Sequence, residues 1–309
     1  MQAGIIINRL LASLKMPQIP DNYCAFDTET TGFDRNKDLI IEWGHCMVHD
    51  RKVVNRASFL INWYDPASGI PPSYIDARLE WIANQMRVNG RTWRITPELL
   101  KTRGMSPVKF IPWLLQYLRT VQESGIMFAS HNGINYDTQM ITAHFKHNLG
   151  EDFVFGPDEV FDTGAIEKAS QMTDTEKAMP APGEAMNEYF RRICYCHAPG
   201  AIWNLDQHVV TKYDMIKKYG LDPTKMHTAG EDSFALYCLM EEFRRLTDET
   251  RDEFSHMTFP PRAPLPVKPV KTVKLSKPAA PAAQPRVQGT TAVYNSLPVR
   301  PSYRRQRSR

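Results

Sequence analysis

Apolar and polar positions along the first 250 residues form blocks that predict both strands and helices. Short runs rich in apolar or β-branched residues predict strands at 23–26, 39–48, 53–63, 126–129 and 160–161. The charged turn at 49–52 joins the second and third runs into a hairpin. Apolar residues at helical spacing predict helices at 73–88, 106–120, 135–148, 205–219 and 231–246. Strands that alternate with helices after a hairpin predict an α/β fold with a mixed sheet.

The two ends of the chain differ from this pattern. The first residues form an apolar, acid-free stretch that is interrupted at Asn8 and Arg9, which favours a docking segment over a secretion signal; an organelle-targeting helix is the alternative. Residues 256–309 contain ten prolines and no periodicity, which predicts a disordered tail. We therefore divide the chain into an N-terminal docking segment at 1–21, a globular domain at 22–255 and a basic, Pro-rich tail at 256–309.

Charge is divided along the same boundary. The chain has 38 Lys and Arg residues and 34 Asp and Glu residues, a net charge of +4. The tail holds 11 of the basic residues and none of the acidic ones, so the first 255 residues carry a net charge of −7. Such a tail attracts nucleic-acid backbones and offsets the repulsion between an acidic body and DNA. A protein-docking role for its extended segments and contact with an anionic membrane surface are the alternatives.

Composition excludes several other classes of protein. No apolar run reaches the roughly 18 residues of a membrane helix, so we expect no membrane span. Five cysteines without a framework spacing predict free thiols and an intracellular, cytoplasmic protein that is not secreted. Cys194, Cys196 and His197 offer zinc ligands, but no second ligand pair accompanies them, so free thiols are the favoured interpretation.

Four carboxylates lie at the ends of predicted elements. Asp27 and Glu29 follow the first strand two residues apart, so both side chains point to the same face. Asp137 begins a helix after another buried strand, and Asp232 opens the last helix shortly after His227. An acidic pair after a strand is by itself an ordinary feature of a solvated loop. Four such carboxylates, however, can converge at one edge of a sheet and share divalent cations.

On these residues the chain resembles the DEDDh, or DnaQ-like, family of 3′–5′ exonucleases. The stretch FDTETTG at 26–32 is similar to the family's first motif, residues 131–133 with 136–137 are similar to the second, and His227 with Asp232 to the third. The Asp-Thr pair at 162–163 matches a further recurrent feature. The spacing between Asn132 and Asp137 is closer to that of the three-prime repair exonucleases than to that of bacterial proofreading subunits, which favours a free-standing nuclease.

The resemblance implies a ribonuclease H-like fold, in which helices flank a mixed sheet, and hydrolysis of phosphodiester bonds from the 3′ end of single-stranded DNA. It implies that Asp27, Glu29, Asp137 and Asp232 bind two Mg²⁺ or Mn²⁺ ions. Two such ions hold the attacking and leaving oxygens during the in-line displacement at phosphorus. Mg²⁺ and Mn²⁺ prefer hard carboxylate oxygens as ligands more strongly than zinc does. His227 is then placed to accept the proton of the attacking water.

The sequence also offers candidate contacts to the substrate, namely Thr28, Phe33, His131 and Asn132. Phe33 either stacks on the terminal base or fills the core, and His131 and Asn132 either shape the cleft or order a loop. Arginines and tryptophans at 68–94 suit the wall of a single-strand channel, although an ordinary surface helix has the same pattern. Residues 173–203 are expected to form a long loop over the cleft.

Two other functions stay open at this point. An exoribonuclease or oligoribonuclease would use the same chemistry, because the choice between RNA and DNA depends on contacts to the 2′-hydroxyl. A non-catalytic nucleic-acid-binding adaptor would act through the basic tail, and the complete set of acids argues against it.

Overall fold

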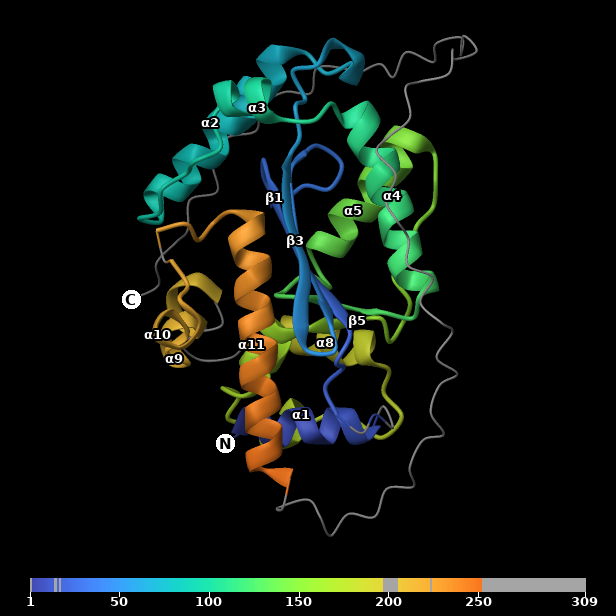
Figure 1. The fold of residues 1–309 in the computed structure, drawn as a ribbon, viewed down its shortest axis with the longest axis vertical. Coiled ribbons are helices and arrows are strands. Elements are labelled where there is room, and N and C mark those ends of the chain that lie inside the picture. The colour runs from blue at the N-terminus through green and yellow to red at the C-terminus, as the bar shows by residue number, and fades with distance from the viewer. Residues whose placement is uncertain (1, 14–15, 17, 197–204, 223, 252–309) are drawn as a thin grey trace, which may run out of the picture. The chain divides into compact units, whose positions relative to one another are not determined.

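The protein is built around one five-stranded sheet, seen in a computed structural model that describes residues 2–13, 16, 18–196, 205–222 and 224–251 (Figure 1). The strand order is β3-β2-β1-β4-β5. The strands are β1 (Tyr23–Thr30), β2 (Ile40–His49), β3 (Lys52–Leu60), β4 (Met127–Ser130) and β5 (Val160–Asp162). Strand β2 runs antiparallel to β1 and β3, whereas β1, β4 and β5 are parallel. The predicted mixed sheet of an α/β fold is therefore confirmed.

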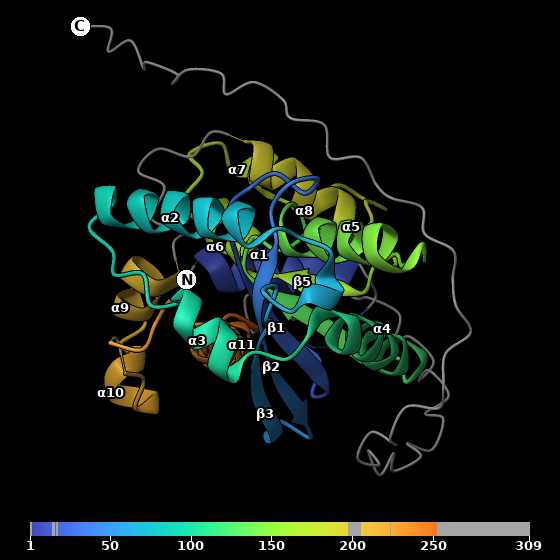
Figure 2. The same ribbon diagram turned by 90° about the horizontal axis from the view of Figure 1, so that it is seen from above.

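Helices cover both faces of this sheet. The long helix α11 (Ala229–Glu249) packs along β1 and β2 on one face, as Figure 1 shows. Helices α4 (Pro107–Glu123) and α5 (Asp137–Leu149) lie on the other side (Figure 2). There the hydroxyl of Tyr117 lies 3.5 Å from the Cys24 sulfur, and its ring packs on His45. Strands β1 and β2 bury side chains on both faces because helices flank them on both sides, whereas the edge strand β3 is largely exposed.

Proline sets the beginning of three helices that follow the hairpin. Helices α2 (Pro72–Val88), α3 (Pro97–Arg103) and α4 each have proline in the first turn. Proline lacks an N–H group and has a fixed φ, so it fits the first turn, whose N–H groups have no partner inside the helix. The helices predicted at 73–88 and 106–120 are present with nearly these bounds, while α3 was not predicted.

Helix α1 (Gln2–Ser13) packs against α11 and α6 (Thr163–Ala169). Ile6, Ile7 and Leu10 are fully buried in this contact. The side-chain amide of Asn8 donates to the Thr247 carbonyl oxygen at 3.1 Å and to the Thr250 hydroxyl at 2.9 Å. The polar interruption at Asn8 is thus used to join α1 to the end of α11. Among the described residues, no helix combines the length and the apolar character that crossing a bilayer requires.

Three local predictions need correction. Strand β1 continues to Thr30 instead of ending at Phe26, because its polar residues pair with β2. The single helix predicted at 205–219 is divided into a π-helical turn (Leu205–Val209), α9 (Val210–Lys212) and α10 (Met215–Tyr219), and Asp214 adopts a left-handed φ of 53° at the last break. The predicted loop at 173–203 contains α7 (Thr175–Ala178) and α8 (Met186–Tyr195).

The buried apolar face of α8 explains why residues 186–195 form a helix instead of a loop. Met186, Tyr189, Phe190 and Ile193 follow helical spacing and are fully buried, and α8 packs against α6 and β5. Residues 197–203 of the predicted loop, the zinc candidate His197 and the tail at 256–309 lie outside the described residues. Cys194 and Cys196 are free thiols, as are the other three cysteines.

Candidate active site

The first two acids of the site are placed by the alternation of β1. Asp27 and Glu29 lie on the face of the sheet that packs against α11. In the antiparallel pairing of β1 with β2 they lie opposite Gly44 and Glu42. Both acids are half-buried. The intervening Thr28 points to the other face, where it is 6% exposed. The strand thus directs two carboxylates to one side of the sheet and a hydroxyl to the other.

Asp232 is brought to these acids by the close approach of α11 to β2. A Cβ atom on Gly44 would overlap the backbone carbonyl of Ala229, the first residue of α11, so the helix can come this near only because residue 44 is glycine. Asp232 lies in the first turn of the helix. As a result, ligand oxygens of Asp27, Glu29 and Asp232 all lie within 4.8 Å of one another.

Asp137 joins the site from the first turn of α5 and lies outside this group of three. It is 4% exposed, and its Oδ1 atom accepts hydrogen bonds from the Thr28 backbone N–H at 3.1 Å and from the Thr28 hydroxyl. Thr28, a predicted substrate contact, therefore uses its hydroxyl to hold Asp137 beside β1. This bond connects the end of β1 to the start of α5, which are 109 residues apart.

The convergence of the acids changes their acidity. Burial and then the carboxylates of Asp137 and Asp232 raise the pKa of Asp27 well above its usual range. Burial, Asp232 and Glu42 raise the pKa of Glu29, and nearby Arg91 opposes that rise. Burial also raises the pKa of Asp137 to about 6, against the bonds from Thr28, which lower it. A cation bound among these groups would relieve both the repulsion and the loss of hydration.

The donor set fits a hard divalent cation. Three carboxylates offer oxygen atoms in one small group, and within the described part of the chain no other group of three His, Cys, Asp or Glu side chains has this geometry. Oxygen ligands of this type are those that Mg²⁺ and Mn²⁺ prefer.

His227 stands two residues before α11 in a strained backbone conformation. Its φ is 66°, in the left-handed region that residues other than glycine rarely adopt, and its backbone N–H donates to Asp232 Oδ1 at 3.3 Å. Thr228 follows as the N-cap of the helix, and its hydroxyl accepts from the Glu231 N–H at 3.4 Å. The turn before α11 thus holds the histidine and the fourth acid together.

His131 and Asn132 lie in the connection between β4 and α5, where buried Asp162 orders the backbone. Asp162 Oδ1 accepts from the Asn132 N–H at 2.9 Å, and its Oδ2 accepts from the Ile134 N–H at 3.0 Å. His131 Nδ1 lies 2.9 Å from the Thr163 hydroxyl. Asn132 has a φ of 63°. These contacts support a role of both residues in ordering the loop that leads to Asp137 at the start of α5.

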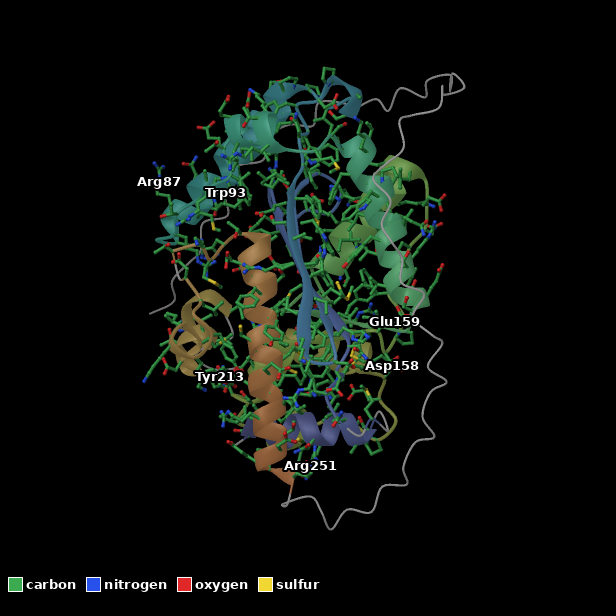
Figure 3. All side chains as sticks on the ribbon, in the orientation of Figure 1. Arg87, Trp93, Asp158, Glu159, Tyr213 and Arg251 are labelled. Atoms are coloured by element: carbon green, nitrogen blue, oxygen red, sulfur yellow. The ribbon has the colours of Figure 1, made fainter. Side chains whose placement is uncertain are left out.

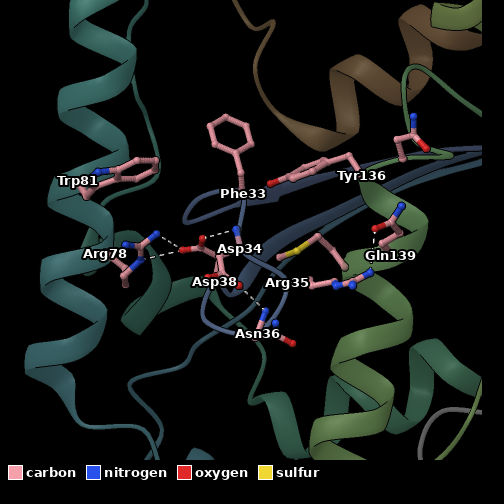
Figure 4. Close-up of a pocket in the computed structure, with 11 residues that line it drawn as sticks. Phe33, Asp34, Arg35, Asn36, Asp38, Arg78, Trp81, Tyr136 and Gln139 are labelled. Carbon is pink, nitrogen blue, oxygen red and sulfur yellow. Dashed lines mark hydrogen bonds and ion pairs between the residues drawn. The ribbon is translucent and has the colours of Figure 1, made fainter. Parts of the chain in front are cut away.

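Phe33 lies at the rim of an open pocket of about 550 Å³ (Figure 4). The ring is 75% exposed, so Phe33 is not a core residue. Its centroid lies 6.3 Å from that of Trp81 on α2 and 5.7 Å from that of Tyr136, the residue before Asp137. We call this the Phe33 pocket; it presents aromatic side chains, and Tyr136 in its wall lies near Asp137 and Glu29.

The arginines of segment 68–94 serve different purposes. Arg78 forms an ion pair with Asp38 and donates to the Thr31 carbonyl oxygen at 3.2 Å, which holds the loop after β1 (Figure 4). Arg87 lies at the outer end of α2, where it donates to Asn84 at 2.9 Å (Figure 3). Arg94 lines a second pocket beside α11. The segment as a whole is therefore not one continuous basic wall.

Glu42 is an acid of the site that the sequence pattern did not single out. It is 5% exposed, and burial raises its pKa. One of its oxygens accepts from the Ser58 hydroxyl, and the other accepts from the Ala229 N–H at 3.2 Å. The signal that could have revealed it is an acid inside the apolar run 40–43, where a charged side chain requires partners.

Comparisons with known proteins give limited likenesses. No family model matches the chain, and no curated protein matches it. A structure of E. coli exonuclease I in complex with a dA16 oligonucleotide is 16% identical, with a TM-score of 0.46 over 75% of this chain and 43% of that one. The zinc-bound E. coli exonuclease I–ssDNA complex is 15% identical, with a TM-score of 0.47 over 75% of this chain and 43% of that one. The chain spans less than half the length of these structures.

Proposed function

We propose that the protein is a metal-dependent 3′–5′ exonuclease that removes mononucleotides from single-stranded DNA, as the resemblance to DEDDh exonucleases implies. The observation that carries this proposal is the convergence of Asp27, Glu29 and Asp232 within 4.8 Å, with Asp137 beside them. These residues come from two strand positions and two helix starts spread over 200 residues of sequence. Such a cluster does not stabilise a fold, because it places like charges close together in a partly buried site. Its presence therefore points to a function.

In this proposal Asp27, Glu29 and Asp232 hold the metal, and Asp137 completes the site for a second ion. Bound Mg²⁺ or Mn²⁺ would neutralise the charge of the phosphate and activate the attacking water. The protein's own contribution is to fix the carboxylates before substrate arrives. Thr28 holds Asp137, and the contact of Ala229 with Gly44 holds the helix that bears Asp232.

We assign the general base to His227. A histidine can accept a proton near neutral pH, and the backbone N–H of His227 donates to Asp232 Oδ1, which keeps the histidine beside that acid. The strained φ of His227 agrees with a functional constraint on this position. Replacing His227 with alanine should lower turnover about 10²- to 10⁴-fold without loss of metal binding.

The Phe33 pocket is proposed to receive the terminal nucleotide. Stacking on an exposed aromatic ring tolerates every base, which suits an enzyme that degrades a strand of any sequence. Phe33, Trp81 and Tyr136 provide such rings, and Tyr136 lies near Asp137 and Glu29. Trimming of a strand from its end requires a subsite of this type next to the reacting phosphate.

A direct test compares degradation of 5′-labelled DNA and RNA oligonucleotides of matched sequence in Mg²⁺ and in Mn²⁺. We expect a ladder of shortened, 5′-labelled DNA products from the wild type and none from Asp27→Asn. Preferential degradation of the RNA would assign the same chemistry to an exoribonuclease. Absence of metal-dependent products from both substrates would overturn the proposed function.

A further inference from the structure

A second open pocket, of about 370 Å³, lies on the face of the sheet that carries the acids, between β3, α3 and the start of α11. We call it the β3–α3 pocket. Its lining includes Glu42, Ser58, Leu60, Arg94, Leu99 and Arg103. Phe59, Ile95, Met105 and the N-cap residue Thr228 complete its walls. A volume of this size accommodates about one nucleotide.

The β3–α3 pocket adjoins the candidate active site on the side away from the Phe33 pocket. Glu42 in its wall is the direct partner of Glu29 in the pairing of β1 with β2, and Thr228 follows His227 in the chain. In the sheet, β2 and β3 lie on one side of β1, whereas β4, which leads to Tyr136, lies on the other. The carboxylates therefore stand between two pockets at the same end of the sheet.

The chemistry of the β3–α3 pocket suits a sugar-phosphate unit. Leu60, Ile95 and Leu99 offer an apolar wall. Arg94 and Arg103 are exposed, and neither guanidinium group forms a hydrogen bond or ion pair with another residue in the described part of the chain. Other arginines near the site are engaged, since Arg56 pairs with Glu231 at 2.7 Å and Arg78 pairs with Asp38. Two uncommitted guanidinium groups beside an apolar wall can bind phosphates while the wall contacts sugar or base.

We propose that the β3–α3 pocket is an upstream subsite, which binds the part of the DNA strand on the 5′ side of the reacting phosphate through Arg94 and Arg103. This inference rests on the proposed function and on assignment of the terminal nucleotide to the Phe33 pocket. The strand then crosses the carboxylates with one nucleotide in each pocket. Contacts on both sides of the reacting bond would hold it in position over the acids.

The test uses two substrates that differ only upstream. Thymidine 5′-monophosphate p-nitrophenyl ester has the terminal nucleotide and no upstream one, whereas a dT10 oligonucleotide has both. Arg94→Gln, Arg103→Gln and the double variant should raise KM for dT10 about five- to tenfold for each guanidinium group that is removed. Hydrolysis of the ester should be unchanged, and KM for dT10 should become less sensitive to salt. Arg87→Gln, at the outer end of α2, is the matched control and should behave as the wild type.

Two results would overturn the subsite. One is a double variant with wild-type KM and salt dependence on dT10, and the other is an equal loss of activity on both substrates. Failure of the proposed function looks different, because the wild type would then hydrolyse neither substrate. In that case fluorescence anisotropy with labelled dT10 still tests the β3–α3 pocket, since the double variant must bind the oligonucleotide more weakly than Arg87→Gln does.

Discussion

At the scale of single residues, Asp137 shows how burial and acidity are linked in this site. Its carboxyl is 4% exposed and has its pKa raised from 3.8 to about 6. The folded protein therefore keeps this proton between pH 4 and 6, where the unfolded chain has lost it. The resulting stabilisation is present below about pH 4 and is lost as the pH rises through 6, and it amounts to about 3 kcal/mol.

We predict that the metal-free protein loses stability between pH 4 and 7 and that Asp137→Asn reduces this loss. Asparagine can still accept the bonds from Thr28 but has no charge to bury. Thermal unfolding in EDTA, measured for both proteins across this range, checks the prediction. Addition of Mg²⁺ at pH 7.5 should raise the melting temperature of the wild type more than that of the variant. Parallel pH curves in EDTA would contradict this account.

Glu42 makes a different contribution, because its two oxygens bind donors from β3 and α11. We predict that Glu42→Ala lowers the free energy of unfolding by about 1 to 3 kcal/mol, since it leaves the buried Ala229 N–H without its acceptor. Turnover should fall as well, because the turn that bears His227 is then no longer bonded to the sheet through Glu42. Glu42→Gln, which keeps an acceptor and adds a donor for Ser58, should restore most of both. Equal defects in the two variants would show that the charge of Glu42, and not its hydrogen bonds, is what matters.

At the scale of elements, the position of α11 against β2 decides whether the site exists. We predict that Gly44→Ala destabilises the protein by about 2 to 3 kcal/mol, because the added methyl group overlaps the backbone at Ala229. It should also abolish the increase in melting temperature on addition of Mg²⁺, since Asp232 moves with the helix. Val54→Ala on the exposed part of β3 is the control and should change stability by less than about 0.5 kcal/mol. Retention of the Mg²⁺ effect in Gly44→Ala would mean that the helix is free to shift without disturbing the site.

The elements also show where the sequence was sufficient. The hairpin, α2, α4, α5 and α11 were predicted because each has a clear apolar period or a recognisable N-terminus. The helix predicted at 205–219 was wrong, since Asp214 adopts a left-handed conformation that no local pattern signals. Helix α8 was missed because the prolines before it suggested a loop, although Tyr189, Phe190 and Ile193 follow helical spacing.

At the scale of the whole molecule, the separation of charge predicts how the protein captures its substrate. Deletion of residues 256–309 removes 11 basic side chains and no acidic ones. We predict that this deletion raises KM for long single strands and weakens its salt dependence, while turnover of the p-nitrophenyl ester is unchanged. Steady-state kinetics at two or more salt concentrations check this. Loss of turnover on the ester would show that the tail is needed for the chemistry itself.

The sequence by itself singled out the acids that are proposed to carry the chemistry. The alternation of a strand puts Asp27 and Glu29 on one face, and helix starts mark Asp137 and Asp232, because these patterns are properties of a few neighbouring residues. Only the tertiary structure decided that Glu42 shares the site, that Phe33 is exposed and that Arg94 and Arg103 flank a pocket beside it. These facts depend on contacts such as that of Glu42 with Ala229, 187 residues apart, and on the approach that Gly44 allows, which no local periodicity encodes.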